Sequence, residues 1–317
     1  MMLLKAYRFL LRILRPNSGL TRLSFNSVTN YLFSFEKKLL AATLIDGTPM
    51  EIDKDDYHGR ILWIFGTNDW KVSRTVNALL EPGDTLLDIG ANYGSIGLIA
   101  RHKVGSSGKV HLFEPQTYLA ERLKSAISAA RATNAIVHQV ALFDSDGEME
   151  LALSHGHSGL ATLVGTVKPS TPSDRVMVPI HQTESYVRAL VSERSFGVKI
   201  DIEGAEPHVL PGLVSFDGLK FVVFEGDRNK RALFDIFAGH GFTVYGLCRT
   251  IFSPRVEQLR GSEDLERFHD FVAVRVAEST SLRRLRLGEL ARLMADFPGR
   301  KGKRMPTEAQ LRTLGDK

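Results

Sequence analysis

The sequence predicts an α/β fold, in which a mostly parallel sheet carries helices on both faces. From residue 85 onward, short apolar runs typical of buried strands alternate with amphipathic stretches typical of helices. The connections between them are short, as in sheets that are built from β-α-β units. The chain has 317 residues, 43% hydrophobic and 24% charged, which is the composition of an ordinary globular protein. We therefore expect one large α/β domain with additions at both ends.

The first part of the chain predicts a β-hairpin and then a helix. LIDGTPMEI (44–52) has the turn signal Asp46-Gly47 between apolar residues, and a helix is expected over 71–80. The main domain follows as strand TLLDIG (85–90), helix SIGLIARH (95–102), strand KVHLFEP (109–115), helix TYLAERLKSAISAARA (117–132) and strand AIVHQVAL (135–142).

The alternation is interrupted after Asp144 and then resumes. GEMELAL (147–153) and RVMVPI (175–180) are typical of hairpin strands, and the stretch 154–174 between them is rich in Gly, Ser, His, Thr and Pro. The remaining expected elements are FGVKID (196–201), PHVLPGL (207–213), FVVFEGD (221–227), RALFDIFAGHG (231–241), FTVYGL (242–247) and FVAVRV (271–276). One sheet, interrupted by an insertion over the active face, is therefore predicted.

Positive charge is concentrated at the two ends of the chain. No Asp or Glu precedes Glu36, whereas five Lys or Arg residues do, and residues 281–304 carry eight bases against two acids. MMLLKAYRFLLRILRP (1–16) repeats bases and apolar residues at helical spacing on different faces. Each end predicts an amphipathic helix, which either binds a membrane surface or a partner or packs on its own domain. No apolar stretch is long enough to span a membrane, and no secretory signal is recognisable.

These observations predict three parts and a cellular context. We expect an N-terminal helix and hairpin extension over 1–80, the main domain over 81–277, and a basic C-terminal helix with a loose tail over 278–317. The single cysteine, Cys248, excludes an internal disulfide and favours a reducing compartment. A cytoplasmic location is expected, peripheral at a membrane if the terminal helices bind one. The ends have no base-reading motif, which disfavours nucleic acid as a partner.

LLDIGANYGSIG (86–97) indicates a ligand at the end of a strand. Asp88 is followed by Gly90, Gly94 and Gly97, which let the backbone approach a ligand where a Cβ would obstruct it. The spacing is G-x-x-x-G and differs from the G-x-G-x-x-G that cradles a pyrophosphate. A carboxylate at this entrance repels phosphate and suits an ammonium or sulfonium group.

VHLFEP (110–115) ends the next strand in an acid, Glu114. A carboxylate at this position is placed to accept hydrogen bonds from both hydroxyls of a ribose. A glycine turn and a ribose-binding acid without a phosphate cradle point to S-adenosylmethionine.

VKIDIEGAE (198–206) places three carboxylates after a buried strand. Strand alternation puts Asp201 and Glu203 on one side, and Glu206 falls at the start of the next helix, where the helix dipole favours an acid. Lys199 is interpreted as a residue that faces away from that side. Asp201 and Glu203 are therefore the candidates for contact with cofactor and acceptor, and closely held acids raise one another's pKa, as a general base requires.

Other titratable residues are further candidates for the catalytic base or for a metal site. Glu225 ends the following strand and is another candidate base, whereas His208 is interpreted as a surface or packing residue. Carboxylates also bind hard divalent cations, so a metal remains an alternative, although no other strand end offers a cluster of Asp or Asn. His155 and His157 have no Cys partners for zinc, which favours a flexible substrate loop. We predict no metal site.

Several segments together resemble the FkbM-type family of S-adenosylmethionine-dependent methyltransferases, within the Rossmann-like methyltransferase superfamily. The similarity extends over about residues 45–275 and rests on GTNDWKVSR (66–74), LEPGDTLLDIGANYGSIGL (80–98), VHLFEP (110–115), VALFDSDGEMEL (140–151), VKIDIEGAEPHVLPG (198–212), FVVFEG (221–226) and GHGFTVY (239–245). Asn68 and Trp70 depart from the family pattern, and the basic ends lie outside it.

The resemblance implies roles for particular residues. Asp69 would bind the amino group of the cofactor, at a position where the family often has Glu. The methionine end would be lined by Asp88, Gly90, Asn92 and Gly94. Glu114 would hold the ribose, and Leu142 and Phe143 would border the adenine.

Methyl transfer to a hydroxyl requires an aligned acceptor, exclusion of water and removal of one proton. We expect an S-adenosylmethionine-dependent O-methyltransferase in which Asp201, Glu203 or Glu225 is the base. The resemblance implies that the acceptor is a hydroxyl of a sugar, glycolipid or other secondary metabolite. Two alternatives are methyl transfer to nitrogen or a carboxylate on the same fold, and a non-catalytic adenosine-binding module that docks on membranes.

Overall fold

The computed structural model describes residues 2–14, 18–165, 173–191, 194–226, 229–248 and 255–275. The expected basic C-terminal helix and the tail over 278–317 lie outside the described residues, as does most of the second half of the 154–174 stretch. No helix in these ranges is long and apolar enough to cross a membrane.

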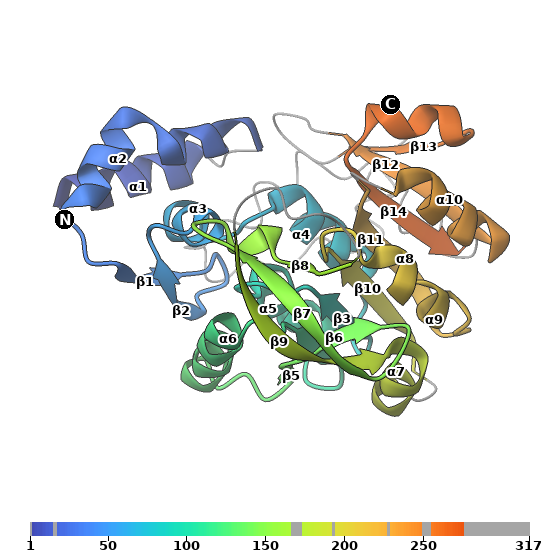
Figure 1. The fold of residues 1–317 in the computed structure, drawn as a ribbon. Coiled ribbons are helices and arrows are strands. Elements are labelled where there is room, and N and C mark those ends of the chain that lie inside the picture. Colours follow the sequence, from blue (N-terminus) through green and yellow to red (C-terminus); the bar gives the residue numbers. More distant parts are fainter. Residues whose placement is uncertain are drawn as a thin grey trace.

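An eight-stranded sheet forms the centre of the molecule, in the order β13-β12-β14-β11-β10-β3-β4-β5 (Figure 1). Its parallel strands are β3 (Thr85–Ile89), β4 (Lys109–Phe113), β5 (Ala135–His138), β10 (Phe196–Ile200) and β11 (Leu219–Glu225). Antiparallel pairs then add β14 (Asp270–Arg275), β12 (Phe242–Cys248) and β13 (Arg255–Gln258) at one edge. The predicted α/β fold with a mostly parallel sheet is confirmed.

Helices cover both faces of this sheet, because the strands are apolar on both sides. On one face, Leu86 and Val223 belong to an apolar cluster with α4 (Trp70–Leu79), α5 (Ser95–Val104) and α6 (Thr117–Ala129). On the other face, Leu87 and Val222 pack with α7 (Thr183–Val191), α8 (Glu206–Val209), α9 (Pro211–Val214) and α10 (Lys230–Gly239). Neighbouring strand residues thus serve opposite layers of the core.

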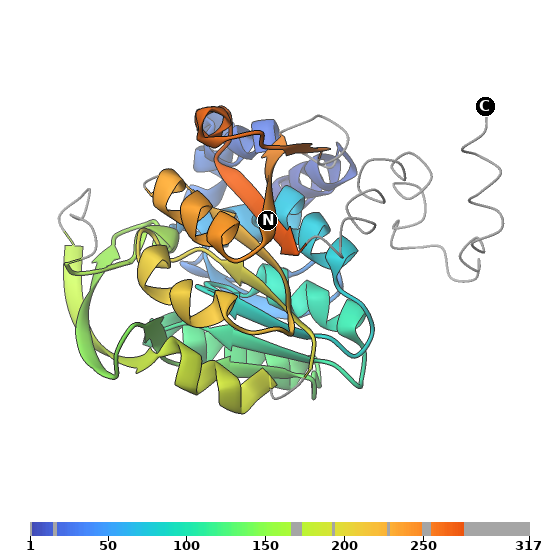
Figure 2. The same cartoon turned by 90° about the vertical axis from the view of Figure 1, so that its right-hand side faces the viewer.

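The insertion is a second sheet with the order β6-β9-β7-β8. Its strands are β6 (Ala141–Phe143), β7 (Gly147–Ser154), β8 (Thr162–Leu163) and β9 (Ser173–Gln182), and a short 3-10 helix, η2 (Ser158–Leu160), joins β7 to β8. Figure 2 shows this sheet (green) at one side of the molecule. Its apolar face packs around Ala205, so the insertion lies against the chain that follows β10.

The single strand expected over 135–142 is divided between the two sheets. Residues 135–138 form β5 beside β4, and 141–143 form β6 beside β9. An apolar run indicates burial and does not specify the sheet that buries it. The chain leaves the main sheet here, and this change of partner builds the wall of a cavity.

The N-terminal extension contains α1 (Met2–Leu14), the 3-10 helix η1 (Ser18–Phe25), α2 (Ser27–Ser34) and the hairpin β1 (Leu39–Thr43) and β2 (Pro49–Asp53), followed by α3 (Tyr57–Phe65). The hairpin turn forms at the expected residues, where Gly47 has φ +91° and Asp46 accepts the amide of Thr48 at 3.0 Å. In Figure 1, α1 and α2 lie at the upper left, outside the main sheet.

Candidate active site

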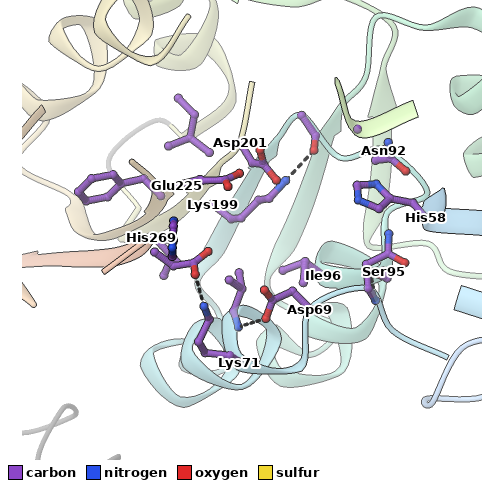
Figure 3. A pocket seen from close by; sticks show the side chains of 18 of the residues that line it. His58, Asp69, Lys71, Asn92, Ser95, Ile96, Lys199, Asp201, Glu225 and His269 are labelled. Carbon is purple, nitrogen blue, oxygen red and sulfur yellow. Dashed lines mark hydrogen bonds and ion pairs between the residues drawn. The ribbon is translucent and has the colours of Figure 1, made fainter. Parts of the chain in front are cut away.

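A cavity of about 730 Å³, which we call the large cavity, lies at the carboxyl ends of β3, β10 and β11 (Figure 3). A smaller cavity of about 70 Å³ adjoins it beneath β6 and the end of β4. The residues that line both cavities are His58, Gly90, Asn92, Gly159 and Asp201. The two cavities are therefore neighbouring parts of one cleft, at the sheet edge where ligands bind in open α/β folds.

The turn after β3 passes between the two cavities. Gly90 has φ +73°, and a Cβ on it would lie 1.9 Å from the backbone oxygen of Asp201. Glycine is thus required here by the neighbouring chain after β10 as well as by the positive φ. Asn92 also has positive φ, +52°, which asparagine tolerates better than most residues. Gly90 and Asn92 line the cleft, and their contact with the methionine end of the cofactor stays a prediction.

Glu114 is buried beside this turn and lines the smaller cavity with Leu142. Its carboxylate accepts the backbone amides of Asn92 at 2.8 Å and Gln116 at 2.9 Å. Burial raises the pKa of Glu114 to about 7, against the effect of these two amides. A carboxylate can accept about four hydrogen bonds, so Glu114 has capacity left for ligand hydroxyls.

Three residues predicted to contact the cofactor are absent from the described lining of both cavities. Asp88 lies beneath the turn, where it accepts the amide of Gly97 at 2.9 Å. Gly94 begins α5 at φ +69°, and a Cβ on it would lie 2.3 Å from Leu123 of α6. Phe143 stacks on His208 with ring centroids 4.5 Å apart. The structure gives these three residues positions that support the fold around the cleft.

The interpretation of Lys199 as a residue facing away from the site is wrong. Lys199 is buried and lines the large cavity. Its Nζ lies 3.2 Å from Oδ1 of Asp88 and donates to the backbone oxygen of Gly90 at 2.6 Å. The charge of Asp88 raises the pKa of Lys199, against the desolvation that lowers it. The signal was present in the sequence, because Lys199 and Asp201 are two residues apart and share one side of the strand.

The structure brings together the three predicted candidates for the base. Asp201, Glu203 and Glu225 are half-buried, line the large cavity, and each places one carboxylate oxygen within 4.8 Å of the other two. Figure 3 shows Asp201 and Glu225 beside Lys199. A divalent cation would find three oxygen ligands here, so this arrangement is also compatible with the metal alternative.

Glu206 has a different place from its three neighbours. It is the first residue of α8, as predicted, and its carboxylate accepts the amides of Ile202 and Gly204, each at 3.0 Å. These bonds close the turn in which Glu203 has φ +54° and Gly204 has φ +104°. Burial raises the pKa of Glu206. Glu206 therefore holds the turn that directs Glu203 into the cavity.

Asp69 marks the other wall of the large cavity (Figure 3). It is the N-cap of α4, and its Oδ1 accepts the amide of Val72 at 2.9 Å. Nearby, Lys71 forms an ion pair with Asp270. Asp69 lines the cavity and can accept further hydrogen bonds, so the predicted contact with an ammonium group stays a prediction that this position allows.

A strap of the insertion, residues 156–160, covers the junction of the two cavities, and sequence reasoning missed how it is held. Ser158 donates to Asp56 through its amide at 2.6 Å and its hydroxyl at 3.0 Å, and Asn92 donates to that hydroxyl at 2.9 Å. The ring of His157 stacks on Tyr57 at 4.4 Å. The expected flexible substrate loop is, over these residues, anchored to α3 and to the glycine turn.

His58 lies beneath this strap and was also missed. A Cβ on Gly159 would lie 2.2 Å from its Cε1, so the ring packs directly against the strap backbone. Burial lowers the pKa of His58, which keeps the imidazole neutral at neutral pH. No sequence signal near His58 distinguishes it, because its contacts come from residues about a hundred positions away.

The positions of the hydrogen-bond acceptors in the cleft fit S-adenosylmethionine. Glu114 in the small cavity suits a ribose, Asp69 in the large cavity suits an amino group, and the turn at Gly90 joins the two. Residues 88–238 match the family model of the methyltransferase FkbM domain. The chain carries an FkbM methyltransferase domain. The predicted FkbM domain is thereby confirmed for residues 88–238, and with it methyl transfer in general and the cofactor S-adenosylmethionine.

Three solved structures of low sequence identity are among the matches. The chain has 10% identity to a precorrin-6y C5,15-methyltransferase from Geobacter metallireducens GS-15, covering 64% of this chain and 86% of that one, with a TM-score of 0.36. A SAM-dependent methyltransferase from Aquifex aeolicus has 11% identity, 64% and 88% coverage, and a TM-score of 0.35. Fibrillarin from Aeropyrum pernix, in complex with S-adenosyl-L-methionine, has 12% identity, 75% and 94% coverage, and a TM-score of 0.36. No curated protein matches the sequence.

Proposed function

We propose that this FkbM methyltransferase transfers a methyl group from S-adenosylmethionine to a hydroxyl of a sugar, a glycolipid or another secondary metabolite. The observation that supports this most is the convergence of Asp201, Glu203 and Glu225 in the large cavity. Bound S-adenosylmethionine supplies an electrophilic methyl group. The protein has to align the acceptor and remove its proton, and carboxylates serve both purposes.

The charge of the large cavity favours a neutral acceptor. Its described lining includes six carboxylates and two ammonium groups. Both ammonium groups are engaged, Lys71 with Asp270 and Lys199 with Asp88. A phosphate or carboxylate acceptor would meet a lining in which carboxylates outnumber ammonium groups, so carboxyl methylation is disfavoured. An acceptor with several hydroxyls can donate hydrogen bonds to these carboxylates.

An amine is the second candidate acceptor, because the same excess of carboxylates attracts a cation. For an amine, the acids would orient the acceptor and need not remove a proton from a hydroxyl. The two candidates differ in the atom that receives the methyl group, which a product analysis determines directly.

The experiment is a methyl-transfer screen that measures S-adenosylhomocysteine in the presence of glycan, lipid-linked glycan and amine acceptors. We expect turnover with a hydroxyl acceptor and a product whose new methyl group is bound to oxygen. A product methylated at nitrogen contradicts the O-methyltransferase proposal. Binding of S-adenosylmethionine by calorimetry without turnover on any acceptor class supports the non-catalytic binding module instead.

We also include a peripheral location at a membrane in this proposal. The supporting observation is the concentration of positive charge at the chain ends, where residues 1–35 carry five bases and no acid. Cytoplasmic leaflets present anionic lipid headgroups that attract such segments.

A further inference from the structure

The two N-terminal helices and the C-cap of α2 expose five large apolar side chains. We name this group the α1–α2 patch, and its members with their exposed fractions are Phe9 (68%), Leu10 (54%), Val28 (60%), Tyr31 (66%) and Phe35 (69%). They are half of the ten large hydrophobic residues found exposed in the described part of the chain. So many exposed apolar side chains on one short segment are typical of an interaction surface.

The orientation of α1 explains why Phe9 and Leu10 face outward, although Leu11 of the same helix is buried in the core. Arg12 donates to the backbone oxygens of Ile64 at 2.9 Å and Thr43 at 2.7 Å. Arg8 lies over the ring of Trp63, 4.5 Å from its centroid. The basic side of α1 is thus used to fix the helix on α3 and the hairpin. A surface helix normally turns its apolar side inward, and Phe9 and Leu10 do the opposite.

The exposed apolar residues of α2 and its C-cap, Phe35, lie on one side of the helix. Val28, Tyr31 and Phe35 are spaced i, i+3 and i+7, which places them on one side of the helix. The rings of Tyr31 and Phe35 contact each other edge to face, with centroids 5.0 Å apart. The half-buried Glu36 and the exposed Lys37 follow Phe35. Aromatic rings with a neighbouring lysine are the composition of segments that lie in the headgroup region of a bilayer.

Charge decides between the candidate partners of this surface. Residues 1–35 carry five bases and no acid, and residues 281–304 carry eight bases and two acids. A second copy of the chain would bring its own basic segment to the patch, and so would the C-terminal tail, so like charges would meet in both cases. An anionic lipid surface presents opposite charge together with apolar chains.

We propose that the α1–α2 patch docks on an anionic lipid surface. The same extension supplies Thr21, in η1 between the two helices, to the wall of the large cavity. Docking therefore holds the acceptor cavity close to the surface, and, resting on the proposed function, the acceptor is a hydroxyl of a lipid-linked glycan. The aromatic side chains bury apolar area in the interface, while the exposed Lys37 beside the patch is attracted to the headgroups.

The test measures co-sedimentation of the full chain with vesicles. Vesicles of phosphatidylcholine with phosphatidylglycerol are compared with pure phosphatidylcholine, at low and high salt. The double variant Tyr31→Ser, Phe35→Ser removes two rings of the patch, and Met177→Ser on β9, 56% exposed, is the matched control. We expect the double variant to weaken binding to the anionic vesicles roughly tenfold, the control to leave it unchanged, and salt to weaken it.

Other results overturn the proposal. One such result is that the unaltered chain does not bind the anionic vesicles, and another is that the double variant binds them equally well. A third is that the unaltered chain forms a dimer in sedimentation velocity and the double variant does not, which would make a second copy the partner. Calorimetry with S-adenosylmethionine tests the proposed function separately from the docking proposal. Vesicle binding without cofactor binding contradicts the proposed function and leaves docking intact. If the chain binds both vesicles and cofactor, the double variant should lose activity on lipid-linked acceptors and keep its activity on water-soluble ones. An equal loss on the two kinds of acceptor contradicts the role of docking.

Discussion

The ammonium group of Lys199 lies 3.2 Å from the carboxylate of Asp88, and both side chains are buried under the turn that carries Gly90. Lys199 also donates to the backbone oxygen of Gly90 at 2.6 Å. One cation therefore links β10, which leads into the acid cluster, to the end of β3, which leads into the cofactor turn. A buried ion pair of this kind adds little net stability but makes the loss of either partner costly.

Replacing Lys199 by Met should destabilise the fold by about 3 to 5 kcal/mol, because the carboxylate of Asp88 stays buried without its cation. Urea unfolding measures this free energy. Lys38→Met is the matched control, since it removes an ion pair with Asp53 at 3.4 Å in which the lysine is 71% exposed. The control should cost less than about 1 kcal/mol. Equal destabilisation by the two variants would contradict the account of the pair.

Affinity for S-adenosylmethionine should increase as pH rises through about 7. Burial raises the pKa of Glu114 to about 7, so the carboxyl group is protonated in a growing fraction of molecules below this pH. The ribose hydroxyls of the ligand donate hydrogen bonds best to the ionised carboxylate, so the ligand binds the ionised form of Glu114 more tightly than the protonated form. The stability of the fold depends on pH in the opposite direction. Ionising a carboxyl group whose pKa is raised in the folded state costs stability as pH rises between its unfolded value, 4.5, and about 7.

Calorimetric titration across this pH window, on the intact protein and on Glu114→Gln, tests the prediction. The variant should bind more weakly and without the pH dependence, because an amide does not ionise. A pH dependence that persists in Glu114→Gln would assign the effect to another group.

The main sheet was predictable because its strands are buried on both faces. TLLDI (85–89) and LKFVVFE (219–225) are nearly continuous apolar runs, and such runs indicate strands of a parallel sheet without further information. The run at 135–142 shows the limit of this signal, since it predicts burial and not the change of sheet between β5 and β6. The strand β13 was missed because RVEQ (255–258) is mostly polar.

The candidate site was predictable where its residues are close in sequence. Asp201 and Glu203 follow one strand, and alternation places them together, as it should have placed Lys199. The contact of Asp56 with Ser158 joins residues 102 positions apart. Asp56 has the local features of any helix N-cap, and its second role depends on the tertiary fold alone.

Removing the hydroxyl of Ser158 should loosen the strap and speed the release of cofactor. Ser158→Ala deletes the bonds to Asp56 and Asn92, of 3.0 and 2.9 Å, and leaves the backbone contacts in place. We expect dissociation of S-adenosylmethionine to accelerate roughly fivefold to thirtyfold, since one or two hydrogen bonds contribute about 1 kcal/mol each. Stopped-flow fluorescence of Trp70, which lines the cavity, measures the rate. Ser145→Ala, at an exposed serine, is the control, and an equal change in both variants would exclude a role for the strap.

Single amide substitutions should identify the base among the three convergent acids. Asp201→Asn, Glu203→Gln and Glu225→Gln each keep the shape of the side chain and remove its ability to accept a proton. In one of them kcat should fall by about 10² to 10⁴, which is the usual contribution of a general base, and the acidic limb of the pH–rate profile should disappear. The other two should change KM more than kcat, because they contact the acceptor without accepting its proton. Calorimetry with S-adenosylmethionine verifies that each variant still binds the cofactor. If all three variants retain kcat and the acidic limb, the proton of the acceptor is taken by another group.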